Sequence, residues 1–158
     1  MIACFIALCT QAQIQRKFMG QTLGVSTKTE VLSSLSSKGG YLSTVNGKEV
    51  VALKNYSFGG YTWGLIMFQF SKEIFSEILM MESEFTPDEI KDAKYKSLVK
   101  QLDDKYGQYK ISDDQEDTKG YSDGSTCLVI LNRGIYFLMG YSDEEISNKV
   151  AKEGADEL

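Results

Sequence analysis

Histidine is absent from this chain of 158 residues, and proline and tryptophan occur only once each. Without an imidazole the chain cannot build a histidine-based catalytic triad, a cysteine–histidine pair or the usual zinc and haem ligand sets. Basic residues (17) are outnumbered by acidic ones (22), which gives a formal net charge of −5. Nucleic acid and anionic lipid both favour a basic surface. We therefore expect no metal ion, no cofactor and no nucleic-acid partner.

The N-terminus has no charge over its first twelve residues. The apolar run Ile2–Cys9 is too short for a transmembrane span, which needs about 20 residues, and Thr10-Gln11-Ala12 has the small-x-small pattern that signal peptidase cleaves. We expect residues 1–12 to be a signal peptide, truncated at its start because a basic region is missing. The protein would then be periplasmic or secreted. The alternative is a lipid anchor on Cys9, although Leu8 stands where a small residue is preferred.

Cleavage after Ala12 would remove two of the three cysteines, Cys4 and Cys9. Cys127 would remain, inside an apolar run, where a cysteine usually acts as a small buried hydrophobic residue. The mature chain would then hold no internal disulfide. Residues 13–143 are enough for a single domain with its own core, and residues 144–158 form a charged tail or helix.

The first half of the domain predicts a helix followed by strands. Thr27-Lys28-Thr29-Glu30 has the spacing of a capping box, and Gly39-Gly40 ends the helix that it starts. Asn46-Gly47 predicts a type I′ turn between two strands, residues 41–45 and 48–53. Two further β-rich segments, 61–70 and 74–81, complete this half.

The second half repeats this order. Thr86-Pro87-Asp88-Glu89 predicts another capping box, with Phe85 and Ile90 as its hydrophobic staple, and Gly107 ends the helix. We predict that its buried face consists of Ile90, Ala93, Leu98, Val99, Leu102 and Tyr106. After a polar, acidic stretch, segments 126–132 and 135–141 form a hairpin. The sequence therefore predicts an α+β fold, in which two helix-plus-strands half-repeats share an antiparallel sheet of about six strands with the helices on one face.

Three patterns in the sequence resemble catalytic or metal-binding motifs. Ser97-Leu98-Val99-Lys100 has the spacing of serine acyl-transfer enzymes, but the companion motifs of those enzymes are missing. An acidic loop could offer oxygen ligands to Ca²⁺, yet it lacks the EF-hand pattern and is more typical of a solvated loop; its members are Asp113, Asp114, Glu116 and Asp117. Carboxylate pairs keep a hydrolase of the cell envelope as an alternative; these are Glu82 with Glu84, and Asp143 with Glu144. We assign no catalytic residue.

The segment 61–70 carries the best candidate for a binding site. Strand alternation would place Tyr61, Trp63, Leu65 and Met67 on one face and Ile66, Phe68 and Phe70 on the other. One face must pack against the helices, and an open second face would be an apolar patch of the kind that marks an interaction site. The alternative is that both faces are covered and the strand belongs wholly to the core.

Short motifs along residues 18–143 resemble small exported proteins of Gram-negative gut bacteria built from two helix-plus-strands units. These motifs are Phe18-Met19-Gly20, Leu23-Gly24-Val25-Ser26, Lys38-Gly39-Gly40, Phe58-Gly59-Gly60, Lys105-Tyr106-Gly107 and Leu138-Met139-Gly140-Tyr141-Ser142-Asp143. The layout is similar to the β-lactamase-inhibitor-protein-like fold, shared with the small-protein-A/outer-membrane-lipoprotein-A family. The resemblance implies a non-catalytic α+β module that interacts with other proteins, and no functional residue carries over.

We therefore expect a non-enzymatic binding module whose partner is a protein or another component of the cell envelope. A carboxylate-dependent hydrolase and a structural protein attached to the envelope are the alternatives.

Overall fold

The computed structural model describes residues 13–112 and 116–156. The expected signal peptide with Cys9, and Asp113 and Asp114 of the acidic loop, lie outside the described residues. The first described elements are two short paired strands, β1 (Lys17–Phe18) and β2 (Gln21–Thr22), and α1 (Lys28–Ser36) follows them. Four strands follow: β3 (Tyr41–Val45), β4 (Lys48–Phe58), β5 (Tyr61–Ser71) and β6 (Ile74–Met81).

The second half has the same order of elements. It starts with α2 (Asp88–Tyr106) and a 3₁₀ turn (Gly107–Tyr109), followed by β7 (Lys110–Ser112), β8 (Thr118–Ser122), β9 (Thr126–Arg133) and β10 (Tyr136–Asp143). A last helix, α3 (Glu144–Asp156), occupies the segment expected as a charged tail or helix. None of the described helices is both long and apolar enough to span a bilayer.

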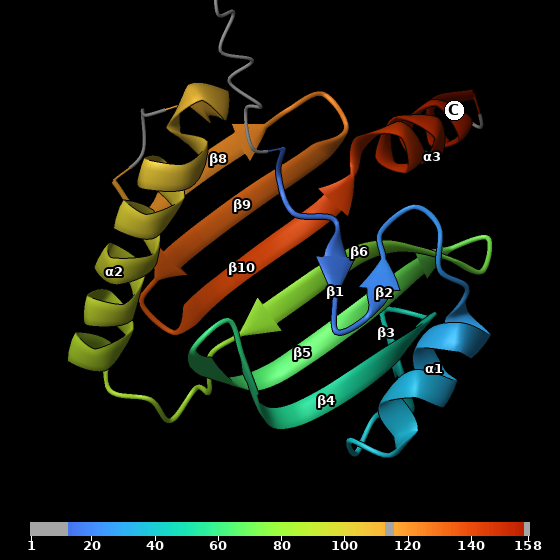
Figure 1. Ribbon diagram of the computed structural model, residues 1–158, viewed down its shortest axis with the longest axis horizontal. Helices are drawn as coiled ribbons and strands as arrows, with labels where there is room; N and C mark the ends of the chain where they lie inside the picture. Colours follow the sequence, from blue (N-terminus) through green and yellow to red (C-terminus); the bar gives the residue numbers. More distant parts are fainter. Residues whose placement is uncertain (1–12, 113–115, 157–158) are drawn as a thin grey trace, which may run out of the picture.

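One antiparallel sheet joins the two halves, in the order β3-β4-β5-β6-β10-β9-β8-β7 (Figure 1). The last strands of the halves, β6 and β10, pair at its centre, with Gly140 opposite Leu79. The α+β class and the two helix-plus-strands halves are as predicted. The sheet has eight strands rather than about six, because β7 and β8 lie in the polar stretch that offers no apolar alternation.

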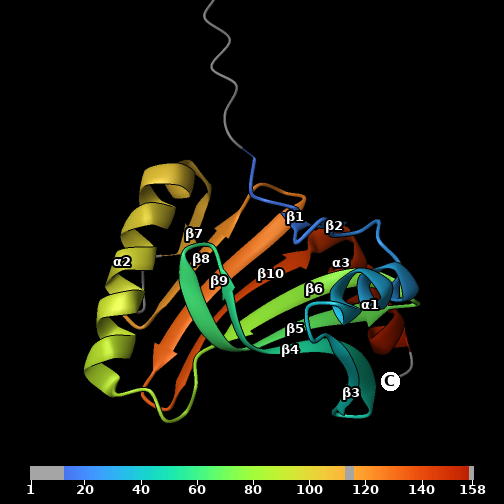
Figure 2. The same cartoon turned by 60° about the horizontal axis from the view of Figure 1, so that its bottom comes forward.

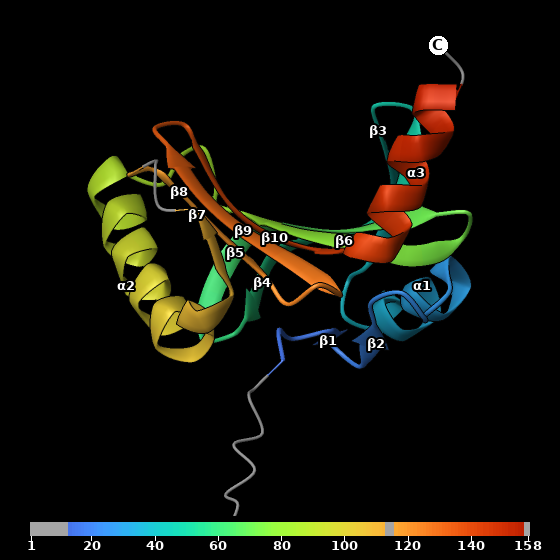
Figure 3. The same cartoon turned by 90° about the horizontal axis from the view of Figure 1, so that it is seen from above.

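Helices α1 and α2 lie at opposite ends of one face of this sheet, and the β1–β2 ribbon lies between them (Figures 1 and 2). Phe18 on β1 is completely buried against Tyr141 and Phe75 of the sheet. Seen from above, α3 lies on the other side of the sheet, near the β5–β6 turn (Figure 3). We refer to the side with α1 and α2 as the helix face, and to the other side as the open face.

The two helix starts differ from each other. At α1 the Thr27 hydroxyl accepts from the Glu30 backbone N–H and the Glu30 carboxylate accepts from the Thr27 N–H, so the predicted capping box is confirmed. At α2 the predicted box is wrong. Pro87 is the N-cap, with no side-chain cap, and the Thr86 hydroxyl donates to Glu82 instead.

The buried face of α2 also differs from the prediction. Its buried residues are Lys91, Tyr95, Leu98, Leu102 and Tyr106, which follow the three- and four-residue spacing of one helix stripe. The predicted staple does not form, since Phe85 and Ile90 are largely exposed. Lys91 can belong to this stripe because its ammonium group donates to Asp88 and to the Gly134 carbonyl, at 3.1 Å each.

Candidate functional site

The four residues predicted to form one sheet surface are divided between the two faces. Tyr61 and Trp63 face α2, where Trp63 belongs to the main core, whereas Leu65 and Met67 belong to a separate apolar cluster on the open face. The expectation that all four share one face is wrong. Ile66 nevertheless lies in the main core, so the alternation changes phase between Trp63 and Ile66.

The change of phase occurs at Gly64 and at Asn55, which lies across from it on β4. Asn55 has a left-handed backbone with φ of 47°, a conformation that asparagine tolerates better than most residues. The strands keep one register on both sides, with Tyr56 opposite Trp63 and Lys54 opposite Leu65. At this point the side chains of both strands therefore exchange faces of the sheet, and no residue is inserted in either strand.

Trp63 contacts both an aromatic ring and a cation. Its ring stacks on Phe137 at a centroid distance of 5.9 Å, and Lys94 Nζ lies 3.8 Å from its centroid on α2's side. The indole N–H donates to the Phe58 carbonyl at 3.2 Å. With 1% of its surface exposed, Trp63 is a core residue. For this residue the alternative interpretation, that the strand belongs to the core, holds.

Lys94 is a site residue that the sequence did not reveal. Its ammonium group donates to Glu82 at 2.6 Å and to the Thr62 carbonyl at 2.9 Å. Burial alone would raise the pKa of Glu82, but the bonds from Lys94, Ser83 and Thr86 outweigh it and lower that pKa. Because a lysine on a helix surface is usually solvated, the residue spacing along α2 did not indicate that Lys94 contacts Glu82 and Trp63.

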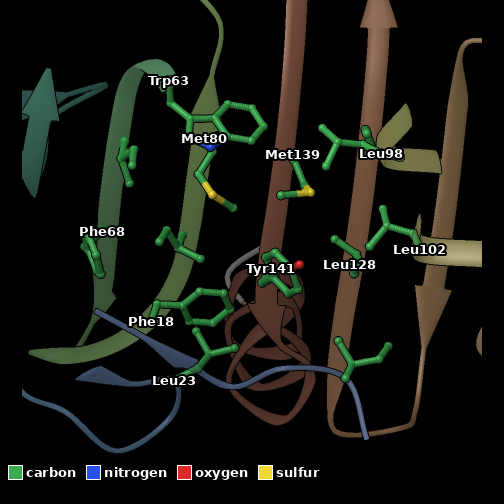
Figure 4. Packing of buried hydrophobic residues seen from close by; sticks show 14 of the residues in the cluster. Phe18, Leu23, Trp63, Phe68, Met80, Leu98, Leu102, Leu128, Met139 and Tyr141 are labelled. Carbon is green, nitrogen blue, oxygen red and sulfur yellow. The ribbon is translucent and has the colours of Figure 1, made fainter. Parts of the chain in front are cut away.

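A pocket opens beside Trp63, between the β4–β5 hairpin and α2. Its volume is about 410 Å³. Five aromatic side chains line it together with polar and aliphatic ones: Phe58, Tyr61, Trp63, Tyr106 and Tyr141, with Gln15, Gln101, Lys105, Leu98, Leu102, Met139 and Gly59. The Tyr61 hydroxyl accepts from Gln101 at 2.7 Å and lies 3.0 Å from Ser97 Oγ. Figure 4 shows Trp63, Met139 and Tyr141 along this side of the core, facing Leu98 and Leu102.

The open face carries two rows of mainly apolar side chains that cross several strands. The pairings place Leu65, Met81, Leu138 and Leu131 side by side in one row, and Ala52, Met67, Leu79, Gly140 and Val129 in the next. Most of the larger side chains in these rows are half-buried. Among the described helices, only α3 lies on this side, toward the end of the sheet (Figure 3).

A third row on the open face is polar. It contains Gln69, Glu77, Ser142 and Cys127, and it runs toward α3. Burial raises the pKa of Glu77 and, together with Glu144 and Glu77, that of the Cys127 thiol. The apolar part of the face is therefore bounded on one side by polar groups, as interaction surfaces commonly are.

Three of the four carboxylates of the hydrolase alternative take part in structural contacts, and the fourth, Glu84, is exposed. Asp143 pairs with Arg16 at 2.5 Å and accepts from the Ile146 backbone N–H at 2.9 Å, where α3 starts. Glu82 is paired with Lys94. Glu144, next to Asp143, receives a hydrogen bond from Ser122. A general acid needs a raised pKa, whereas that of Glu82 is lowered.

No model of a protein family, no curated protein and no solved structure gives a significant match to this chain.

Proposed function

We propose that this chain is an exported, non-enzymatic module that binds another protein through the open face of its sheet. The observation that carries the proposal is the pair of apolar rows, which extends from Ala52 on β4 to Val129 and Leu131 on β9. Apolar surface that is contiguous and bordered by polar groups is the usual mark of a protein interface. Leu65 and Met67, two of the residues predicted from sequence, belong to it.

The other parts of the proposal rest on separate observations. Export rests on the uncharged segment 1–12 and its small-x-small end. The non-enzymatic role rests on the absence of histidine and on the structural contacts of Glu82 and Asp143. Apolar rows that cross several strands suit the broad contact surface of a folded protein better than a small molecule.

Photo-crosslinking tests the proposal. A photoreactive amino acid at position 131, on the open face, is expected to give a discrete adduct in envelope extracts of the producing cell. The same group at the exposed Lys96 of α2, on the helix face, serves as the control (Figure 3). Excess unlabelled protein should compete for the adduct. The Met81→Arg variant should compete at least about tenfold less well, because it places a charge in the centre of the apolar rows.

Met81 is half-buried, so the melting temperature of Met81→Arg is measured first, and Val129→Lys is the second variant for the same face. Equal adducts at positions 131 and 96, or full competition by both variants, would contradict the proposal. An adduct between two copies of the chain would assign the face to self-association instead.

A further inference from the structure

The pocket beside Trp63 is a second candidate site, separate from the open face. Its mouth is formed by exposed residues, among them Gln101 and Lys105, and its floor by the buried rings of Trp63, Tyr106 and Tyr141. A volume of about 410 Å³ falls within the range of pockets that hold small molecules. Aromatic walls with a few polar groups are typical of such pockets.

The Tyr141 hydroxyl sets this pocket apart from an ordinary packing defect. Tyr141 is only 5% exposed, yet its hydroxyl has no hydrogen-bond partner within the described part of the chain. In that same part, every side-chain polar atom that is fully shielded from solvent has a partner. The hydroxyl must therefore keep contact with the pocket. In Figure 4 its oxygen points away from Phe18, toward the side on which Leu102 lies.

A second hydroxyl lies close by. Tyr106 accepts from the Gln15 backbone N–H at 3.2 Å, and its own proton has no acceptor among the described residues. Burial, and then the neighbouring Tyr106, raise the pKa of Tyr141, so this phenol stays protonated at neutral pH. The floor of the pocket thus offers two hydroxyl donors and no carboxylate among its lining residues. Both hydroxyls can thus donate to whatever occupies the pocket, either water or a guest.

We propose that this pocket binds a small, flat, apolar molecule whose carbonyl or carboxylate oxygen accepts a hydrogen bond from Tyr141. The rings of Trp63 and Tyr106 would contact the flat body, because stacked and edge contacts between rings are favourable. Lys105, with Nζ 4.9 Å from the centre of the Tyr106 ring, stands at the mouth and tolerates a negative charge there. This site is independent of the open face.

Trp63 provides the measurement, because it is the chain's only tryptophan and it lines the pocket. Its indole N–H gives a single cross-peak in a ¹H–¹⁵N correlation spectrum. Acetophenone and phenylacetate, which carry an accepting oxygen, are titrated alongside ethylbenzene, which has none. We expect at least one oxygenated probe to shift the indole peak saturably, while the amides of Met67 and Met81 on the open face do not move.

Tyr141→Phe removes the hydroxyl and keeps the ring. It should weaken the oxygenated probe by up to about tenfold and leave any ethylbenzene binding unchanged, since one hydrogen bond is lost. Tyr136→Phe, on an exposed ring far from the pocket, is the matched control and should change nothing.

Two results would overturn the proposal. The first is the absence of any saturable shift with all three probes, which would mean that the pocket holds water alone. The second is that Tyr141→Phe has no effect on the oxygenated probe, or weakens ethylbenzene as strongly. Neither result bears on the crosslinking at the open face, so the two sites are tested separately.

Discussion

At the scale of single residues, one lysine organises the junction between α2 and the sheet. Lys94 holds a carboxylate, a backbone carbonyl and the face of the Trp63 ring at once. The side chains of Lys94 and Glu82 are only 8% and 11% exposed. A pair shielded to this degree is costly to break, because the remaining charge stays out of water.

Glu82→Gln should therefore destabilise the protein by about 2 kcal/mol at pH 7. The folded pKa of Glu82 is lowered, so its ionisation adds stability above the unfolded pKa of about 4.3. That stability is lost as the pH falls through the folded pKa, and the difference from wild type should shrink toward pH 3. Urea unfolding at both pH values measures it.

The matched control is Glu84→Gln, which removes an exposed carboxylate two residues away and should change stability by less than about 0.5 kcal/mol. A Glu82→Gln effect that is equally large at pH 7 and pH 3 would contradict the role given to the ionised carboxylate.

At the scale of elements, the change of phase in β4 and β5 decides where the aromatic side chains go. It places Tyr61 and Trp63 under α2, and so creates the pocket, while Leu65 and Met67 stay on the open face. Gly64 lies at this point, where a Cβ would come within 2.7 Å of the Ser83 backbone nitrogen. The segment after β6 can approach β5 only because this side chain is missing.

Gly64→Ala is accordingly expected to cost about 1–3 kcal/mol, as backbone must shift to admit the methyl group. Gly120→Ala in β8 is the matched control. Its nearest contact would be the end of the Ile111 side chain at 3.7 Å, an ordinary distance, and its effect should stay within about 0.5 kcal/mol. Thermal and urea unfolding compare the two. Equal losses would show that a strand glycine alone, rather than the Ser83 contact, sets the cost.

Sequence could predict the elements that rest on local chemistry. The Asn46-Gly47 turn has φ of 51° and 75°, as a type I′ turn requires, and the Thr27 cap forms. The change of phase could not be predicted, because alternation assumes a regular strand and Asn55 lies across from Gly64 only once the strands pair. The predicted binding site was wrong for the same reason, because Tyr61 and Trp63 lie on the helix face and only Leu65 and Met67 lie on the open face.

At the scale of the whole molecule, the sheets of the two halves are joined where their final strands pair. The Met81–Leu138 and Leu79–Gly140 pairs belong to this central contact. Sequence indicated the repeat of helix and strands, but the contact itself joins segments far apart in the chain, for which local patterns carry no information. The same holds for β8, whose sequence Thr118–Ser122 is polar and is held by its neighbour β9.

This arrangement has a consequence for assembly. The halves are linked along the chain by the short segment 82–87 alone, so two chains could exchange their second halves and restore every β6–β10 contact between molecules.

Deleting Glu84 and Phe85, which are both exposed, should favour such an intertwined dimer. The dimer would be detected by sedimentation and would dissociate only slowly. Replacing both by alanine at full length should leave a monomer. A monomeric deletion variant of native stability would contradict this. Segment 82–87 would then act as the hinge, and the β6–β10 pairing would become the interface between two chains.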